Sequence, residues 1–241
     1  MNSLESHLLR QIEHSRKFFW HRLRWRGVKF HLPSAGPFEL LDVGAGAGIL
    51  GEYLQRDLPG GSYRFVEPIA SLQRHLEATY GPDSNLGAQP SYEGIQYLTL
   101  LDVLEHQVDD HRFLRDLVEK MQPGATLIMT VPAFMGLWSR WDVALGHFRR
   151  YKKRSLMDCF DGLPVDVVEM SYLFPEMIPL ALVRRQLERY RKPKRNTGSS
   201  EFPDLPRYVN EILYALGTIS MRLRRLWPVG TSLIAVMQRR Q

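Results

Sequence analysis

The feature that most constrains this chain is an apolar run that ends in three closely spaced glycines. Residues 39–43 read Glu-Leu-Leu-Asp-Val, and Gly44, Gly46 and Gly48 follow before a helical pattern over 49–58. Glycine has no Cβ and adopts positive φ freely, so a ligand can lie against the bare backbone of such a turn. The helix N-terminus behind the turn offers unpaired N–H groups and a partial positive charge. We therefore expect a strand–turn–helix unit that binds a nucleoside-like cofactor.

The rest of the chain alternates between strand and helix patterns, which predicts a parallel sheet with helices on both faces. In such a sheet, ligands bind beyond the carboxyl ends of the strands. Glu67, the segment 102–106 and the segment after Pro132 all fall at that edge, together with the glycine turn. Strands are expected at 63–67, 95–104, 125–131, 165–168 and 230–237, and helices at 4–32, 71–80, 109–121 and 208–227. Residues 81–94 resemble a loop with at best a short edge strand.

Composition indicates an ordinary globular protein. With 241 residues, 44% of them hydrophobic and 24% charged, the chain can form one sizeable α/β domain or two small ones. Its one cysteine, Cys159, excludes an intrachain disulfide and fits a reducing compartment. No apolar run approaches the roughly 18 residues of a membrane span, and the first residues lack the apolar centre of a signal peptide. We therefore expect a cytoplasmic protein.

The net charge of +6 is unevenly distributed. Basic residues crowd three regions, around 10–29, 184–195 and 222–240, which indicates either solvated faces or an anionic partner such as lipid head groups, a phosphorylated substrate or nucleic acid. Residues 171–195 join an apolar run to a cationic tail. Such a segment could lie on an anionic membrane, or it could form a cap that buries the substrate.

The glycine spacing bears on which cofactor is bound. A dinucleotide-binding fingerprint requires a third glycine where this chain has Ile49, so the spacing disfavours an NAD-linked oxidoreductase. Asp42 lies two residues before the first glycine, and a carboxylate there suits the ammonium group of S-adenosylmethionine (SAM). Glu67 ends the next strand, 19 residues after Gly48, where it suits the ribose hydroxyls of either cofactor.

The chain resembles the class I SAM-dependent methyltransferases. Residues 40–48 (LLDVGAGAG) and 63–68 (YRFVEP) resemble their first two motifs, and residues 100–132 resemble their fourth-strand and fifth-strand region. Residues 138–151 (WSRWDVALGHFRRY) resemble a bacterial subgroup with a Gly-His-Phe/Tyr-Arg-Arg-Tyr element after the fifth strand. The resemblance implies SAM as cofactor and S-adenosylhomocysteine (SAH) as product. The implied cofactor-binding residues are Asp42, Gly44, Ala45, Gly46, Gly48, Glu67, Pro68, Asp102, Val103 and Leu104.

The resemblance also implies a Rossmann-like α/β fold with a mostly parallel seven-stranded sheet. We expect one methyltransferase domain over 1–241, with a helical lid (1–34), a core (35–174), a helical cap inserted before the last strand (175–229) and that strand (230–241). No acidic residue in 81–94 can be assigned to the adenine amino group, so that contact stays open.

Methyl transfer is an in-line displacement with a good leaving group, so the enzyme mainly positions the two reactants. A general base is needed where the acceptor is a hydroxyl. His147 is the leading base and His106 the second, since both follow strands at the cofactor edge. Arg149 and Arg150 could clamp a carboxylate or phosphate of the substrate, and Tyr151 could wall an apolar pocket. No metal is predicted, because His, Asp and Glu do not recur at metal-ligand spacing.

These observations predict a SAM-dependent methyltransferase that acts on an oxygen or nitrogen atom of a small or lipid-linked metabolite. An RNA methyltransferase is an alternative suggested by the isoelectric point near 9.5. No Asn/Asp-Pro-Pro-Tyr element follows the fourth strand, which makes nucleic acid the less favoured partner. The acceptor and the oligomeric state stay open.

Overall fold

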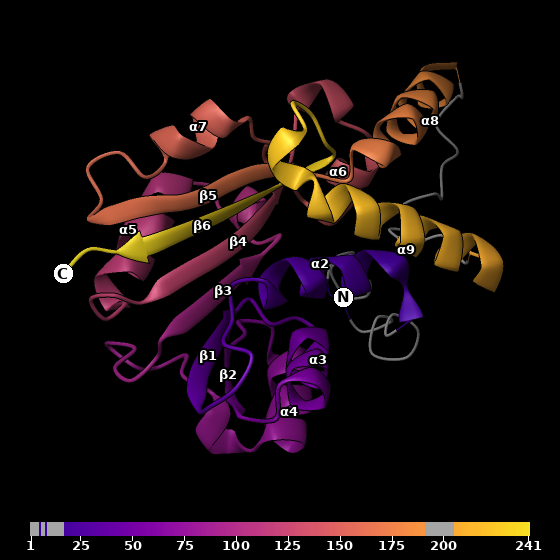
Figure 1. Ribbon diagram of the computed structural model, residues 1–241. Helices are drawn as coiled ribbons and strands as arrows, with labels where there is room; N and C mark the ends of the chain where they lie inside the picture. The colour runs from indigo at the N-terminus through magenta and orange to yellow at the C-terminus, as the bar shows by residue number, and fades with distance from the viewer. Residues whose placement is uncertain (1–4, 6–7, 9–16, 191–204) are drawn as a thin grey trace.

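A computed structural model describes Glu5, Leu8, residues 17–190 and residues 205–241. Its centre is a six-stranded sheet in the order β2-β1-β3-β4-β6-β5 (Figure 1). The pairs among β1 to β4 are parallel, whereas β6 runs antiparallel between β4 and β5. The strands are β1 Phe38–Val43, β2 Gly61–Val66, β3 Tyr97–Leu101, β4 Thr126–Pro132, β5 Val165–Leu173 and β6 Ser232–Arg239.

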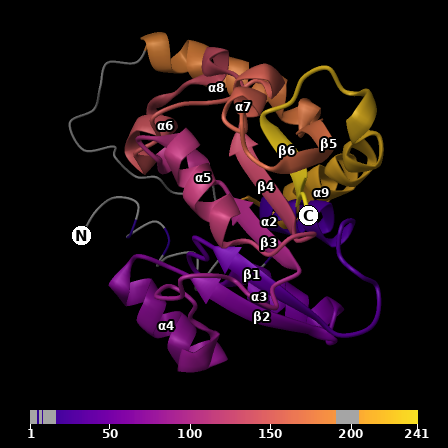
Figure 2. The ribbon, with the colours of Figure 1, turned by 90° about the vertical axis from the view of Figure 1, so that its left-hand side faces the viewer.

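Helices cover both faces of the sheet (Figures 1 and 2). One apolar core joins α5 and α7 to the sheet, and the other joins α2, α3 and α9 to its opposite face. The α-helices are α2 Phe19–Lys29, α3 Ile49–Asp57, α4 Ala70–Tyr80, α5 Asp110–Lys120, α6 Arg140–Leu145, α7 Lys153–Asp158, α8 Ile178–Tyr190 and α9 Arg207–Arg222. Short 3₁₀ turns are η2 Pro82–Ser84, η3 Leu104–His106, η4 Met135–Leu137, η5 Pro175–Met177 and η6 Arg224–Leu226.

The Rossmann-like α/β prediction is confirmed, with one strand fewer than expected in the described part of the chain. The predicted edge strand within 81–94 is reduced to two isolated bridges, one between Phe65 and Asn85 and one between Tyr92 and Met121. Beside the first, the Leu86 N–H donates to the Phe65 carbonyl (2.9 Å). Gly87 and Pro90 follow at once, and neither supports a longer ladder.

Two strands differ in length from their predictions. β3 is shorter than predicted because Asp102 adopts a φ of +56°, which turns the chain out of the sheet into η3. β5 is longer than predicted, and its pairing with β6 contains a bulge between Val167 and Glu169. The early end of β3 lies at the carboxyl edge of the parallel strands, where the predicted site residues gather.

Two helices, α8 and α9, lie between β5 and β6 and form what we call the cap. The cap is fixed by side chains: Asn210 accepts a hydrogen bond from the Phe19 N–H and donates to the Lys17 carbonyl (both 2.8 Å). Where the chain returns to the sheet, Gly230 passes so close to the Leu173 backbone that a Cβ would overlap it. In the described ranges we find no helix with the length and apolar character needed to cross a membrane.

Candidate functional site

The glycine turn has the backbone geometry that its sequence predicts. Gly44, Gly46 and Gly48 have φ values of +74°, +57° and +74°, a region that L side chains rarely adopt. A Cβ on Gly44 would lie 2.6 Å from a methyl group of Val103, and one on Gly48 would lie 2.6 Å from a methyl group of Leu76. Gly48 is also the residue that precedes α3. The turn can therefore form only with glycine at its packed positions.

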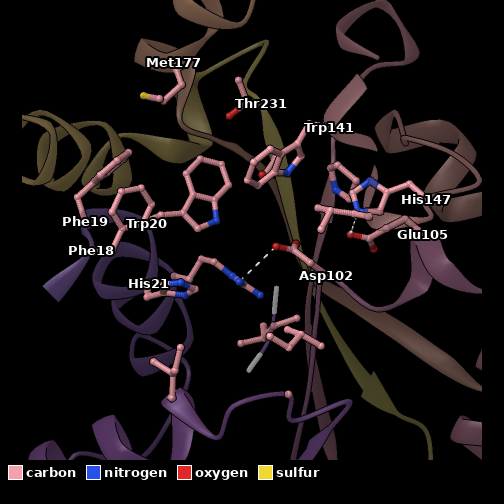
Figure 3. Close-up of a pocket in the computed structure, with 18 of the residues that line it drawn as sticks. Phe18, Phe19, Trp20, His21, Asp102, Glu105, Trp141, His147, Met177 and Thr231 are labelled. Carbon is pink, nitrogen blue, oxygen red and sulfur yellow. Dashed lines mark ion pairs between the residues drawn. The ribbon is translucent and has the colours of Figure 1, made fainter. Parts of the chain in front are cut away.

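A cavity of about 550 Å³ lies between this turn, α2 and the cap (Figure 3). Its volume is within the range of sites for small ligands and cofactors. The end near the sheet is polar, and the end near the cap is mostly apolar, with Arg184 of α8 also in its lining. The polar lining includes Arg24, Asp42, Asp102, Glu105, His106, His147 and Arg150. The apolar lining includes Phe18, Trp20, Leu137, Trp141, Met177, Leu180 and Leu213.

Asp42 offers a buried carboxylate to the cavity. It accepts hydrogen bonds from Thr99 Oγ1 (2.8 Å) and the Tyr63 hydroxyl (3.0 Å), which fix its orientation. Burial raises the pKa of Asp42 to about 6, so the group is ionised at neutral pH. A buried anion beside the glycine turn suits the ammonium end of an amino-acid cofactor. This part of the structure therefore fits SAM.

Glu67 does not line the cavity. Its carboxylate accepts hydrogen bonds from the backbone N–H groups of Gly46 (2.7 Å) and Ile69 (2.8 Å), and so braces the glycine turn from the side of β2. Burial raises the pKa of Glu67. The hydrogen bonds from the two N–H groups act in the opposite direction, because they favour the ionised form. Its contact with a ribose stays a prediction. Pro68 is exposed beside it.

Asp102 contributes a second carboxylate at the end of β3. It accepts a hydrogen bond from Thr130 Oγ1 (2.9 Å) and forms an ion pair with Arg24 of α2 at 3.3 Å, drawn in Figure 3. Arg24 is a site residue that sequence reasoning placed only in a basic cluster, because nothing local links it to Asp102. By contrast, Val103 packs against Gly44, and Leu104 is buried in the core, so neither lines the cavity.

Two described residues of the predicted N-terminal lid lie over the turn and α4. Leu8 is the neighbour that a Cβ on Gly46 would meet, at 3.4 Å. Glu5 accepts a hydrogen bond from the Ser71 hydroxyl (2.7 Å) at the start of α4. The other residues before Lys17 lie outside the described residues. Leu8 therefore approaches Gly46 from the cavity side.

His147 is held by a buried ion pair. Its Nδ1 lies 2.9 Å from Asp142, and Arg150 binds both oxygens of the same carboxylate at 2.7 and 2.9 Å. Although burial acts in the opposite direction, the hydrogen bonds from His147 and Arg150 hold the pKa of Asp142 at about 2. Arg150 also donates to the Ala133 carbonyl (3.3 Å), so its guanidinium is engaged within the protein. Arg150 lines the cavity and also positions Asp142, so its predicted contact with the substrate stays a prediction.

Arg149 and Tyr151 point away from the cavity and meet at Asp110. Arg149 pairs with Asp110 (2.7 Å) and donates to the Val108 carbonyl (2.7 Å). The Tyr151 hydroxyl donates to the same carboxylate (2.8 Å), and its ring is buried in the core. The structure thus contradicts a substrate contact for either residue, because both are committed to scaffolding the segment that carries His147.

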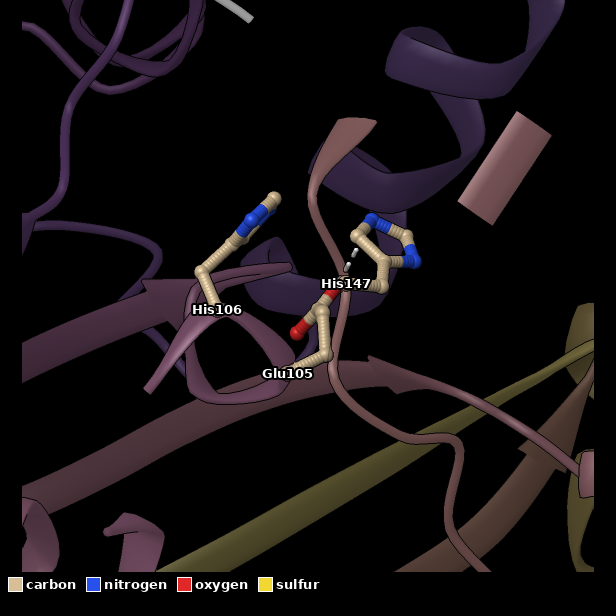
Figure 4. Close-up of side chains that lie close together, drawn as sticks. All are labelled: Glu105, His106 and His147. Atoms are coloured by element: carbon tan, nitrogen blue, oxygen red, sulfur yellow. Dashed lines mark ion pairs between the residues drawn. The ribbon is translucent and has the colours of Figure 1, made fainter. Parts of the chain in front are cut away.

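Glu105, His106 and His147 come together at the polar end of the cavity (Figure 4). Glu105 is fully buried, and neither of its carboxylate oxygens has a hydrogen-bond partner in the described part of the chain. Its nearer oxygen lies 3.9 Å from His147 Nε2, and the two imidazole rings are perpendicular at 4.7 Å. Burial, followed by the charge of Asp102, raises the pKa of Glu105 well above its usual range, and burial lowers that of His106 to about 4.

These three side chains are also a set that could share a cation, because their ligand atoms all lie within 4.8 Å of one another. Zinc ligands lie about 2.0–2.2 Å from the ion, so the three would have to approach one another further. Their spacing in the sequence does not indicate this cluster, since 41 residues separate His106 from His147.

Comparisons with known proteins agree with this geometry. A family model described as a methyltransferase domain matches residues 4–169. No curated protein matches the chain. One similar structure is the complex between the Haloferax volcanii Trm112 methyltransferase activator and the putative methyltransferase (12% identity over 100% of this chain and 99% of that chain, TM-score 0.60).

Two further structures show the same fold. A putative sarcosine dimethylglycine methyltransferase from Galdieria sulphuraria aligns at 12% identity over 91% of this chain and 85% of its own, with a TM-score of 0.57. A SAM-dependent methyltransferase from Archaeoglobus fulgidus aligns at 13% identity over 91% and 94%, with a TM-score of 0.54. The family match covers more than half of the chain. The chain therefore belongs to the methyltransferase-domain family and is a SAM-dependent methyltransferase, with SAM as its cofactor and SAH as the product.

Proposed function

We propose that this methyltransferase acts on an oxygen or nitrogen atom of a small or lipid-linked metabolite bound in the cavity. The observation that carries the proposal is the position of His147, held by Asp142 at the polar end of a cavity whose other end is apolar. The side chains for proton transfer would lie at the polar end, beside the glycine turn that would bind the cofactor. The apolar end suits a hydrocarbon portion of the acceptor.

Several residues would hold SAM. Gly44, Ala45 and Gly46 offer bare backbone, Asp42 offers a carboxylate to the ammonium group, and Arg24 is placed to bind the carboxylate of the methionine end. When bound, SAM supplies an electrophilic methyl group on a sulfonium. The N-terminal residues would close over it as a lid, in keeping with the position of Leu8 over Gly46.

His147 would accept the proton of the acceptor. Asp142 is ionised and can only accept, so the proton of the imidazole lies on Nδ1 and Nε2 carries the free electron pair. SAM would supply the methyl group to the acceptor atom, and the electron pair of the carbon–sulfur bond would stay on sulfur to leave neutral SAH. The acceptor's proton passes to His147 Nε2. His106, which burial keeps neutral, would stand beside it as a second polar contact.

Substitution of His147 tests this proposal. We expect His147→Gln to lower kcat by about 10²- to 10⁴-fold, the usual contribution of a general base, while SAH affinity by calorimetry stays within twofold. Activity is read as SAH formed from SAM with hydroxyl and amine acceptors that carry or lack a prenyl or acyl chain. The matched control is His111→Gln on α5, since His111 does not line the cavity and its ring lies within hydrogen-bond distance of the Asp161 carbonyl and Arg115.

Unchanged kcat in the His147 variant at all pH values would refute the base. If the protein bound NADH but neither SAM nor SAH, the proposal would be overturned, because it requires SAM to bind in the cavity.

A further inference from the structure

The cap helix α9 carries apolar side chains on its outward side as well as on the side toward the protein. The side that packs on the protein includes the buried residues Asn210, Gly217, Ser220 and Met221. The side that faces outward is apolar, at a spacing of three or four residues. We call this outward side the α9 face. It consists of Tyr208, Ile212, Leu216, Ile219, Leu223 and, in η6, Leu226, with exposed fractions between 44% and 75%.

The second cap helix also carries exposed apolar side chains. Leu182, Val183 and Leu187 of α8 are exposed, and both helices project beyond the sheet in Figure 1. Large exposed apolar surface is uncommon on monomeric proteins, and it marks a site of interaction. Other faces of the same helices line the cavity, through Ala181 of α8 and Leu213 of α9.

The charges around the α9 face are of one sign. Arg207 and Arg222 are exposed at the two ends of α9, and Arg225 follows with 73% of its side chain exposed. The one acid between residues 207 and 226 is Glu211, which is paired with Arg22 at 2.6 Å. An apolar helix face flanked by arginines, without an unpaired acid, is the pattern of a helix that lies in the interface of an anionic membrane.

We propose that the α9 face docks this protein onto an anionic membrane surface. The docking itself does not depend on the proposed function. A second step rests on that function: because α8 and α9 also line the cavity, docking would bring the hydrocarbon chain of a lipid-linked acceptor next to the apolar end of the site.

This docking surface differs from the one expected from sequence. Ser171, Tyr172 and Leu173 of the predicted segment 171–195 are buried in β5 and cannot touch a membrane, and residues 191–195 lie outside the described residues. Within that segment, Leu182, Val183 and Leu187 of α8 are exposed. The centre of the docking surface moves to α9, which the sequence pattern had placed only in the cap.

A second copy of the chain is the competing occupant. Two α9 faces related by a twofold axis would bring the arginines at their ends toward those of the partner helix, and like charges oppose such contact. An anionic bilayer instead complements both the apolar residues and the arginines. The observations therefore favour lipid, and self-association becomes an outcome of the test.

The experiment is vesicle sedimentation of the full chain, with 100-nm vesicles of phosphatidylcholine alone or with about 30% phosphatidylglycerol. We expect the wild type to sediment with the anionic vesicles. The triple variant Ile212→Ser, Leu216→Ser, Ile219→Ser should partition about 100-fold more weakly, because it removes three side chains from the interface. Arg207→Gln with Arg222→Gln should lower partitioning about tenfold, on the anionic vesicles only.

The matched control is Val108→Ser with Val168→Ser, which removes comparably exposed apolar side chains outside the cap and should sediment as the wild type. SAH affinity should be unchanged in every variant, so loss of docking is distinguishable from loss of the cofactor site. Wild-type protein that stays in the supernatant, or a triple variant that sediments equally, overturns the proposal. So does a lipid-free dimer in sedimentation equilibrium that the triple variant dissociates, which assigns the α9 face to a second copy.

Discussion

The two ends of the cavity are built by different means. At the cofactor end, backbone conformation makes the site: three glycines at positive φ, with Glu67 bound to two backbone N–H groups. At the cap end, side chains make it: Asn210 holds α2, and Arg224 binds Glu169 on β5. At the cofactor end, almost any added atom would overlap a neighbouring atom. At the cap end, side chains can be exchanged as long as the few anchoring pairs persist.

The largest expected effect is at the cofactor end. Gly44→Ala combines a left-handed backbone with a Cβ placed 2.6 Å from Val103. We expect a loss of about 3 kcal/mol in the free energy of unfolding and a loss of SAH affinity of about 100-fold. Thermal unfolding and calorimetry measure the two quantities.

Gly36→Ala provides the matched control, because Gly36 has a φ of +89° with no atom within 4 Å of the added Cβ. It should cost about 1 kcal/mol and leave SAH affinity unchanged. Equal effects of the two substitutions would show that the close approach at Gly44 is unimportant.

The next effect concerns the attachment of the cap. Arg224 binds both oxygens of Glu169 at 2.6 and 2.9 Å, and both side chains are buried. Glu169→Gln leaves the buried guanidinium without its counter-charge and should lower the free energy of unfolding by about 3 kcal/mol in urea titrations. The control Asp166→Asn breaks an exposed pair with Arg240 and should cost less than about 1 kcal/mol. If SAH affinity falls with the Glu169 variant, the two ends are not independent.

A smaller effect is expected from pH. Burial raises the pKa of Asp42 to about 6, so its carboxylate protonates as the pH falls below that value. SAH affinity should therefore fall about tenfold from pH 7 to pH 5, as the partner of the ammonium group is lost. The free protein should respond oppositely, because the folded state binds this proton more tightly than the unfolded chain and gains stability from it as the pH falls from about 6 to 4. Asp42→Asn should make both profiles flat with respect to this group.

The smallest effect is expected on removal of divalent metal. If Glu105, His106 and His147 serve proton transfer, a chelator should leave the rate of methyl transfer within twofold. A larger loss, reversed by Zn²⁺, would show that the cluster binds a cation instead.

Local sequence was sufficient to predict the glycine turn and the sheet that carries it. The spacing of Gly44 and Gly48 and the alternation of strands and helices are properties of short segments, so the turn and the sheet were both predictable. The site residues of the 138–151 element were not, because which face each side chain takes depends on distant partners. Arg149 and Tyr151 bind Asp110 and so point away from the cavity, and Arg150 binds Asp142. Likewise, no local pattern reports that Arg24 meets Asp102, or that α9 turns its apolar side outward.

The close passage of Gly230 against Leu173 has a consequence for the cap. The chain leaves β5 at Leu173 and returns toward β6 beside the same residue, so both ends of the cap join the sheet at one place. The lining of the cap can therefore change with little effect on the register of β5 and β6, as long as pairs such as Arg224 with Glu169 are kept. Substitutions in the cap would then alter which acceptor fits while the glycine turn stays as it is.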